Sequence, residues 1–384
     1  MKTVLNRILI NLIIISFILF TGCVQSKELE TLGILNTRGV DLSKENNGQI
    51  ETTLLIYQFD AQNKNISKLL SGTGNTLKDA REDANNKTTF LLTPGQIRLE
   101  LYGKEIAQKG ILRYLAALAR DSRASDTMLL AISDTTAKDV LMKGQSQTEI
   151  NVGQFLHGVI DTEYNEDSLL RIDLQTFSHM FADIGHDPIL PIISLENDLP
   201  KLSAMAVFQD DKYVDKISLD DGFLLNLFQN RVSSAPVELT IPREPFKKYE
   251  QYKEISKNKE EELHIRVLLK GKSKTKMTNV QEQHFKTDID LDIEIQEFSQ
   301  LLNIENGHVA DLLKKEIAKE IEQQYDTLLN KLQEINADPF GFGNIYRSNK
   351  KDGKLTKKEW REKFPEIKVD FNVKVRLLNY GTTQ

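Results

Sequence analysis

Two histidines and an aspartate in one short stretch of the chain have the spacing of metal ligands. On a helix, His179, Asp183 and His186 would share one face. Zinc sites are built from three or four such donors with room for tetrahedral geometry. Gly185, however, is a common kind of helix stop, and a surface helix with ordinary polar residues that ends there accounts for the same pattern. We favour the surface helix and predict no metal site.

An alternating acidic run is a second candidate for metal binding. Its carboxylates are Asp288, Asp290, Asp292 and Glu294, and an apolar residue separates each from the next. A calcium loop of the EF-hand type needs a glycine and a bend at its sixth position, where this segment has an isoleucine. A half-buried strand with an acidic outer face explains every residue, so we predict a strand without calcium.

The other patterns with chemical potential are weaker. Gly72-Thr73-Gly74 lacks the Gly-Lys-Ser/Thr ending of a phosphate-binding loop, and we interpret it as a flexible loop. No Gly-x-Ser-x-Gly elbow occurs in the sequence. The lysine-rich run over 347–358 could touch a phosphate or a lipid headgroup, but a solvated loop is favoured. We therefore assign no catalytic residue, metal or cofactor and predict that the chain is not an enzyme.

The only cysteine in the sequence, Cys23, follows a short export signal. Lys2 and Arg7 supply a positive start, residues 8–20 are almost entirely apolar, and two small residues precede the cysteine. A membrane-spanning helix needs about 20 apolar residues, so this stretch fits a signal peptide over 1–22 better. We predict cleavage before Cys23 and thioether lipidation of its sulfur, since no disulfide partner exists. A plain signal peptide with a chance cysteine and an uncleaved anchor helix are the alternatives.

The rest of the composition is that of a water-soluble chain with an acidic surplus. The formal net charge of −6 becomes −8 on loss of residues 1–22, which contain two basic and no acidic residues. An acidic body repels anionic lipid and nucleic acid. We therefore predict no nucleic-acid partner, and attachment to the membrane through the two acyl chains of the Cys23 lipid.

Residue periodicity predicts an α+β protein whose first part is a sheet with helices packed on it. Three prolines, the last at position 200, place a boundary near 195–200. The resulting N-terminal α/β domain covers 23–198. Its expected elements are strands over 49–59, 96–102 and 127–133, helices over 77–84 and 104–120, and a mostly helical stretch over 136–184.

Two further domains are predicted after this boundary, which makes a three-domain ectodomain of mixed β-sheets with packed helices. A small central α/β domain over 199–262 ends in a polar linker, and a C-terminal domain over 263–384 packs a long helix on a sheet. The expected elements are a hairpin of 204–208 with 213–217, a helix over 221–228, strands over 237–241, 263–269, 286–298 and 367–377, and the long helix over 308–335.

Eight segments, in order along the chain, form a recognisable series: Gly22-Cys23, Lys27 to Ile34 (KELETLGI), Gly39-Val40-Asp41, Gln96 to Gly110 (QIRLELYGKEIAQKG), Ala204 to Lys216 (AMAVFQDDKYVDK), Asp338 to Phe342 (DPFGF), Trp360 to Pro365 (WREKFP) and Val369 to Gly381. With these segments the chain resembles the Ger(x)C lipoproteins, the C subunits of bacterial spore germinant receptors. The family often has Trp directly after the lipidated cysteine, where this chain has Val24, and residues 136–200 match the family only loosely.

The resemblance implies a three-domain mixed α/β ectodomain on the outer face of the spore inner membrane. It implies partnership with two integral membrane subunits, A and B, in a complex that responds to small nutrients and triggers germination. No catalytic residue carries over, and Cys23 is the one assigned site. Two other functions stay open: a solute-binding lipoprotein with a small ligand in an interdomain cleft, and a cell-envelope hydrolase with a perturbed acid–base pair.

Overall fold

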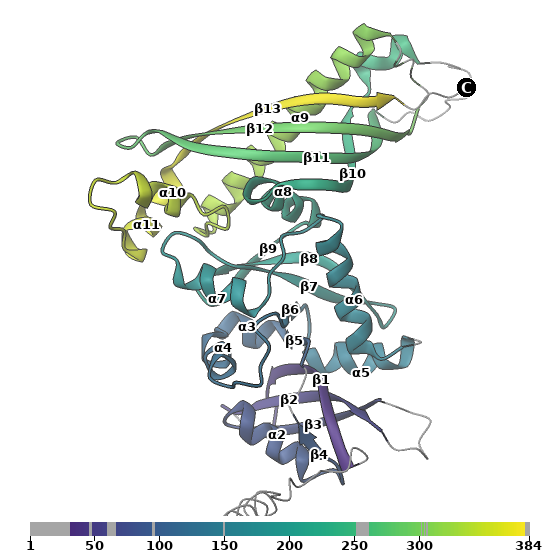
Figure 1. Cartoon of the computed structure of the whole chain (residues 1–384), viewed down its shortest axis with the longest axis vertical. Coiled ribbons are helices and arrows are strands. Elements are labelled where there is room, and N and C mark those ends of the chain that lie inside the picture. Colours follow the sequence, from purple (N-terminus) through teal and green to yellow (C-terminus); the bar gives the residue numbers. More distant parts are fainter. Residues whose placement is uncertain are drawn as a thin grey trace, which may run out of the picture.

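The structure, a computed structural model, describes residues 31–380 apart from 46–47, 60–66, 94–96, 149, 251–260, 301, 303 and 305. In this part of the chain the strands form two sheets, which are stacked along the long axis of the molecule with helices packed on both (Figure 1). The predicted α+β class is confirmed. Within the same described residues, no helix is both long enough and apolar enough to span a membrane.

Sheet A is mixed and has the order β3-β2-β1-β5-β6-β7-β8-β9, with β4 paired to β1 beside that path. Its centre is parallel, from β1 through β5 and β6 to β7, and its two ends are antiparallel. The strands are β1 (Leu32–Leu42), β2 (Ile50–Gln58), β3 (Ser67–Gly74), β4 (Leu91–Thr93), β5 (Leu99–Tyr102), β6 (Leu129–Ser133), β7 (Ile189–Glu196), β8 (Leu199–Gln209) and β9 (Lys212–Ile217).

The helices between these strands supply the crossovers that parallel strands require. The predicted helical stretch over 136–184 is confirmed as three helices. The helices of this half are α2 (Leu77–Asn85), α3 (Lys104–Lys109), α4 (Leu112–Ala119), α5 (Ala137–Gln147), α6 (Val152–Asn165) and α7 (Leu174–Ala182).

The prediction of one helix over 104–120 is wrong because the tip of the β8–β9 hairpin splits it. Gly110 has φ +112°, and a Cβ there would lie 2.6 Å from Oδ2 of Asp211. The same carboxylate accepts a hydrogen bond from the backbone N–H of Leu112 at 3.1 Å. A residue far away in sequence therefore caps a new helix start that local periodicity does not reveal.

The prediction of a flexible loop at Gly72-Thr73-Gly74 is also wrong, because these residues end strand β3. A Cβ on Gly72 would lie 2.1 Å from the carbonyl oxygen of Ala80, and one on Gly74 would lie 2.5 Å from its backbone nitrogen. The glycines thus let helix α2 lie directly on the sheet.

Strand β1, for which the sequence predicts no element, carries a buried ion pair to its neighbour β5. Arg38 on β1 and Glu100 on β5 stand opposite each other in register. The guanidinium donates to both carboxylate oxygens, at 2.9 and 3.0 Å, and the Glu100 side chain is fully buried. Burial raises the pKa of Glu100, and Arg38 opposes that rise. The pair fixes the register of two parallel strands at the centre of the sheet.

Sheet B has the order β10-β11-β12-β13, with antiparallel pairs except for the parallel pair of β12 and β13. The predicted strands and long helix are confirmed, although β11 continues ten residues beyond the predicted end at 269. The elements are α8 (Leu219–Gln229), β10 (Val232–Pro242), the 3-10 turn η2 (Glu244–Tyr249), β11 (Glu262–Asn279), β12 (His284–Phe298), α9 (Gly307–Glu334), α10 (Phe342–Asn349), α11 (Lys357–Lys363), the 3-10 turn η3 (Phe364–Glu366) and β13 (Lys368–Tyr380).

Helix α9 joins the parallel strands β12 and β13 and covers the inner face of sheet B. Its apolar stripe is buried, and Tyr325 stacks on Phe371 of β13 with ring centroids 4.8 Å apart. The Tyr325 hydroxyl donates to the carbonyl of Leu224 at 2.9 Å. That bond joins α9, which packs on sheet B, to α8, which lies between the two sheets (Figure 1).

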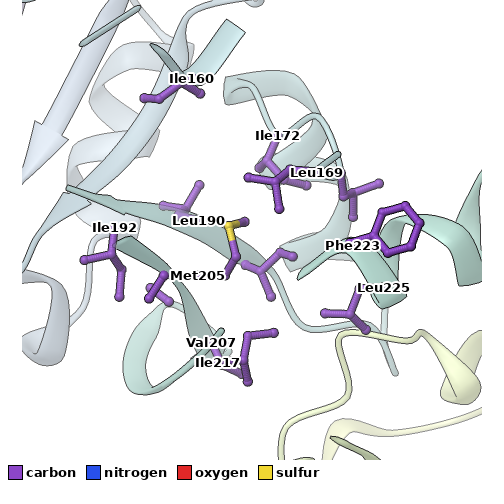
Figure 2. Close-up of a cluster of buried hydrophobic side chains, with 14 of the residues drawn as sticks. Ile160, Leu169, Ile172, Leu190, Ile192, Met205, Val207, Ile217, Phe223 and Leu225 are labelled. Atoms are coloured by element: carbon purple, nitrogen blue, oxygen red, sulfur yellow. The ribbon is translucent and has the colours of Figure 1, made fainter. Parts of the chain in front are cut away.

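A shared hydrophobic core continues from sheet A to α8. Figure 2 shows Met205 of β8 between Leu190 of β7 and the α8 side chains Phe223 and Leu225. All four are buried. The predicted domain limits at residues 198 and 262 stay predictions. Strand β7, before residue 198, pairs along its whole length with β8, which follows that residue, so the backbone hydrogen bonds of sheet A span this limit.

Candidate functional site

A group of charged side chains and one tryptophan lies where segments from the two sheets meet. We call it the junction and define it as Asp187, Asp210, Asp338, Trp360 and Arg361. Asp187 lies two residues before the start of β7 and Asp210 occupies the β8–β9 turn, while the other three come from the α9–α10 connection and from α11. The side chains of Asp187 and Asp338 are almost completely buried.

Asp187 accepts hydrogen bonds on both oxygens from elements that are far apart in sequence. Arg361 donates to Oδ1 and Oδ2 at 2.5 Å each, although 174 residues separate the two. The backbone N–H of Asp338 donates to Oδ2 at 2.7 Å, and that of Asp210 donates to Oδ1 at 3.1 Å. In return, the Asp187 N–H donates to the carbonyl of Asp338 at 2.9 Å. One carboxylate thereby connects four chain segments.

Asp338 organises the α10 end of the junction. Its carboxylate accepts from the backbone N–H groups of Gly341 at 2.9 Å and Gly343 at 3.0 Å, and from Nε1 of Trp360 at 3.1 Å. Burial is the largest influence and raises its pKa to about 7, against the lowering effect of these backbone donors. The neighbouring Phe340 and Phe342 pack on Phe228 of α8, at centroid distances of 4.7 and 5.1 Å.

Two glycines bring two parts of the backbone into contact beside these charges. One part is the half of the molecule that contains sheet A, and the other is the half that contains sheet B. A Cβ on Gly343 would lie 2.3 Å from Cα of Gly185, and one on Gly185 would lie 2.5 Å from Cα of Gly343. The hollow that borders the junction has a volume of about 10 Å³, room for about one water molecule. The arrangement therefore serves to hold the two halves together, and it has no space for a substrate.

Comparisons with known proteins identify the family to which this chain belongs. A family model described as the spore germination protein N-terminal domain matches residues 25–195, and one described as spore germination B3/GerAC like, C-terminal, matches residues 203–381. The chain belongs to the Ger(x)C family of spore germination proteins. The resemblance in the sequence is thereby confirmed.

Individual relatives of this Ger(x)C protein align along nearly their whole length. Spore germination protein GerQC of Bacillus cereus is 24% identical over 375 residues, which cover 97% of this chain and 99% of the relative. Putative spore germination protein YfkR of Bacillus subtilis (strain 168) is 21% identical, covering 92% and 91%. The crystal structure of the GerBC protein superposes with a TM-score of 0.53 at 15% identity, covering 89% and 97%, and shows the same fold.

The Ger(x)C junction is built largely from the segments that carried the resemblance. Asp338 opens the DPFGF segment, Trp360 and Arg361 open WREKFP, and Asp210 lies in the AMAVFQDDKYVDK hairpin. Sequence reasoning did not assign these residues a shared site, and it missed Asp187 entirely. The only signal in the sequence is that all three segments belong to the family resemblance. Nothing in their spacing along the chain indicates that they contact one another.

The three residues with the spacing of metal ligands, His179, Asp183 and His186, are not brought together in this Ger(x)C protein. Helix α7 ends at Ala182, so His186 leaves the helix face that carries His179. Asp183 forms an ion pair with Arg347 at 3.5 Å, while the ring of His186 is 3.3 Å from Nε2 of Gln229. Among the described residues, no three His, Cys, Asp or Glu side chains form a group that could hold a metal ion.

The acidic run lies on strand β12, as predicted, and two of its carboxylates accept hydrogen bonds from the neighbouring strand β13. Asp292 accepts from Arg376 of β13 at 2.6 Å on each oxygen, and Asp288 accepts from Asn372 at 3.1 Å. The prediction of a solvated loop over 347–358 is wrong at both ends, which lie in α10 and α11. Cys23 lies outside the described residues.

The buried carboxyl of Asp338 predicts a pH-dependent stability. Between its ordinary pKa of 3.8 and about 7, the folded chain holds a proton that the unfolded chain has released. This contribution to the free energy of unfolding is fully present below pH 4 and declines as the pH rises to about 7, by on the order of 4 kcal/mol in the limit of full burial. Urea unfolding should therefore show a free energy of unfolding that falls more steeply with pH in the wild type than in Asp338→Asn, which keeps the smaller contribution of Asp41, whose pKa burial raises to about 6. Equal slopes in both proteins would contradict the assignment.

Proposed function

We propose that this chain is a lipid-anchored, non-enzymatic subunit of a nutrient germinant receptor. In this role it supports assembly and signalling of the complex that triggers spore germination, on the outer face of the spore inner membrane, beside integral membrane A and B subunits. The observation that carries the proposal is the match of both spore germination family models, which together leave only short stretches of the chain unmatched.

The junction supports an assembly role. Its residues join the two sheets through buried hydrogen bonds and close backbone contact, which suits a body that presents fixed surfaces to partners. A small solute in a cleft at this place has no support, because the space there is about that of one water molecule.

The anchoring part of the proposal is tested at Cys23. In the native host, mass spectrometry of the N-terminal peptide should show a diacylglyceryl group on the Cys23 sulfur. Replacement of residues 1–23 by a signal peptide without a lipidated cysteine should move the protein from the membrane fraction to the soluble fraction, since two acyl chains provide the stable attachment. Cys23→Ala should likewise abolish lipid labelling. An unmodified thiol, or full membrane retention of the signal-replaced protein, would refute the anchor.

The receptor part is tested separately by affinity purification from spore membranes. The tagged wild-type chain should bring down two integral membrane proteins in fixed ratio. The spores should germinate in response to a nutrient that leaves a deletion strain dormant. Purification of the chain without any integral membrane protein, together with normal germination of the deletion strain, would overturn the receptor assignment whatever the state of Cys23.

A further inference from the structure

A polar hollow in sheet A, unrelated to the junction, collects donor groups for which the described residues provide no partner. It is lined by side chains from three strands or their flanks and from one helix, and its volume is about 170 Å³, several times the share of one water molecule. The polar lining residues are Asn36 of β1, Tyr57 of β2, Arg98 just before β5, and Gln154 and His157 of α6.

The walls of this hollow are held by backbone contacts. The N–H of Arg98 donates to the carbonyl of Asn36 at 2.8 Å, and its own carbonyl accepts from Leu129 of β6 at 2.9 Å. Gly153 brings the first turn of α6 onto β1, because a Cβ there would lie 2.1 Å from Oγ1 of Thr37. The lining groups are therefore positioned by strands and a helix rather than by loops alone.

The charge of the hollow is positive and unbalanced. Within the described residues, Arg98 forms no ion pair, and no hydrogen bond engages the side chains of Tyr57, Gln154 or His157. None of the described residues that line the space is acidic, and the nearby Asp161 is bonded to Arg171 at 3.0 Å. A guanidinium, a phenol, an imidazole and two amides thus surround the space, and the side chains of Arg98 and Gln154 are exposed and open to a ligand from solvent.

We propose that this hollow is a binding site for a small organic monocarboxylate. The planar guanidinium of Arg98 matches the two oxygens of a carboxylate, and the amide and phenol groups supply further donors. Ile34 and Leu35 line the same space and would contact the carbon part of the ligand. The volume is below that of pockets for drug-sized molecules, so the ligand is small.

A single negative charge fits this lining better than two. Burial lowers the pKa of His157 and outweighs the opposing effect of Asp161, and Arg98 lowers this pKa as well, so the neutral form of the imidazole is favoured. Arg98 is then the one full positive charge in the space, which favours a carboxylate over a phosphate dianion. The site does not depend on the proposed receptor role.

The test uses the full-length lipidated chain in detergent and three probes, sodium butyrate, butyramide and inorganic phosphate. Binding of butyrate and butyramide is measured by saturation-transfer NMR titration, and binding of phosphate, which has no observable protons, is measured by its competition with the butyrate signal. Butyrate should bind, and the neutral butyramide and phosphate should bind at least about tenfold more weakly, as expected for loss of a charge-assisted hydrogen bond. This comparison needs no variant and so does not depend on the folding of any mutant.

Arg98→Met removes the cation and keeps most of the stem, and it should weaken butyrate binding at least about tenfold. Arg120→Met is the matched control, because Arg120 is an exposed arginine at the end of α4, outside the hollow. It should leave binding unchanged. The proposal is overturned if butyrate and butyramide bind alike, if phosphate binds more tightly than butyrate, or if the two arginine variants lose binding equally.

Discussion

Arg361→Met should lower the free energy of unfolding by about 3–5 kcal/mol, one of the two largest effects expected for a single substitution in this chain. The substitution removes both hydrogen bonds to Asp187 and leaves that carboxylate buried beside the raised-pKa carboxyl of Asp338. An uncompensated buried charge is costly, whereas the original pair is not necessarily strongly favourable. Denaturant titration followed by tryptophan fluorescence measures the loss and also reports directly on Trp360 of the junction.

The chain offers a matched control with the same chemistry on its surface. Arg376 also makes two hydrogen bonds to one aspartate, Asp292, at 2.6 Å each, but its side chain is 72% exposed. Water and salt weaken such a pair, so Arg376→Met should cost no more than about 1 kcal/mol. If the two substitutions prove equal in cost, burial does not distinguish the junction from an ordinary surface pair.

Gly343→Ala should destabilise the protein, although alanine is the better helix former. Gly343 lies in helix α10, where the exchange would normally stabilise by about 1 kcal/mol. Here the new Cβ meets Cα of Gly185 at 2.3 Å and Cε2 of Trp360 at 2.8 Å. Forcing the two backbones apart should cost about 1–3 kcal/mol or more, and should also disturb the hydrogen bond from the Gly343 N–H to Asp338.

Gly158→Ala in helix α6 is the matched control, for which we expect a change in stability of the opposite sign. A Cβ on Gly158 meets nothing within 4 Å, so this variant should become more stable by up to about 1 kcal/mol. Thermal unfolding should therefore shift in opposite directions for the two alanine variants. A shift in the same direction would mean that the close approach of the two halves at Gly343 can relax at little cost.

The elements with long regular periodicity were predictable from sequence. The predicted helix over 308–335 matches α9 within one residue at each end, because its apolar stripe runs unbroken for seven turns. The last strand, predicted over 367–377, is β13. In both elements one face is buried and the other is solvated, so apolar and polar residues recur with the period of a helix or of a strand.

Strand β1 shows why other elements were not predictable. Its central residues include Asn36, Thr37 and Arg38, which are polar yet almost completely buried. Arg38 is tolerated there because Glu100 neutralises it, and that partner is 62 residues away. The junction could not be predicted for the same reason, because Asp187 can be buried only when it pairs with Arg361. Sequence periodicity indicates which face of one element is buried, but it does not indicate which residues of two distant elements are in contact.

The pairing of β7 with β8 bears on how the protein can be divided for experiment. The N-terminal family match ends at residue 195, and the C-terminal match begins at 203, so the two strands fall on opposite sides of that division. A recombinant fragment that stops at residue 198 would leave β7 with an unpaired hydrogen-bonding edge rich in isoleucine and leucine, which invites aggregation between copies. A fragment that continues to residue 217 keeps the β8–β9 hairpin over that edge and should stay soluble at concentrations where the shorter one precipitates.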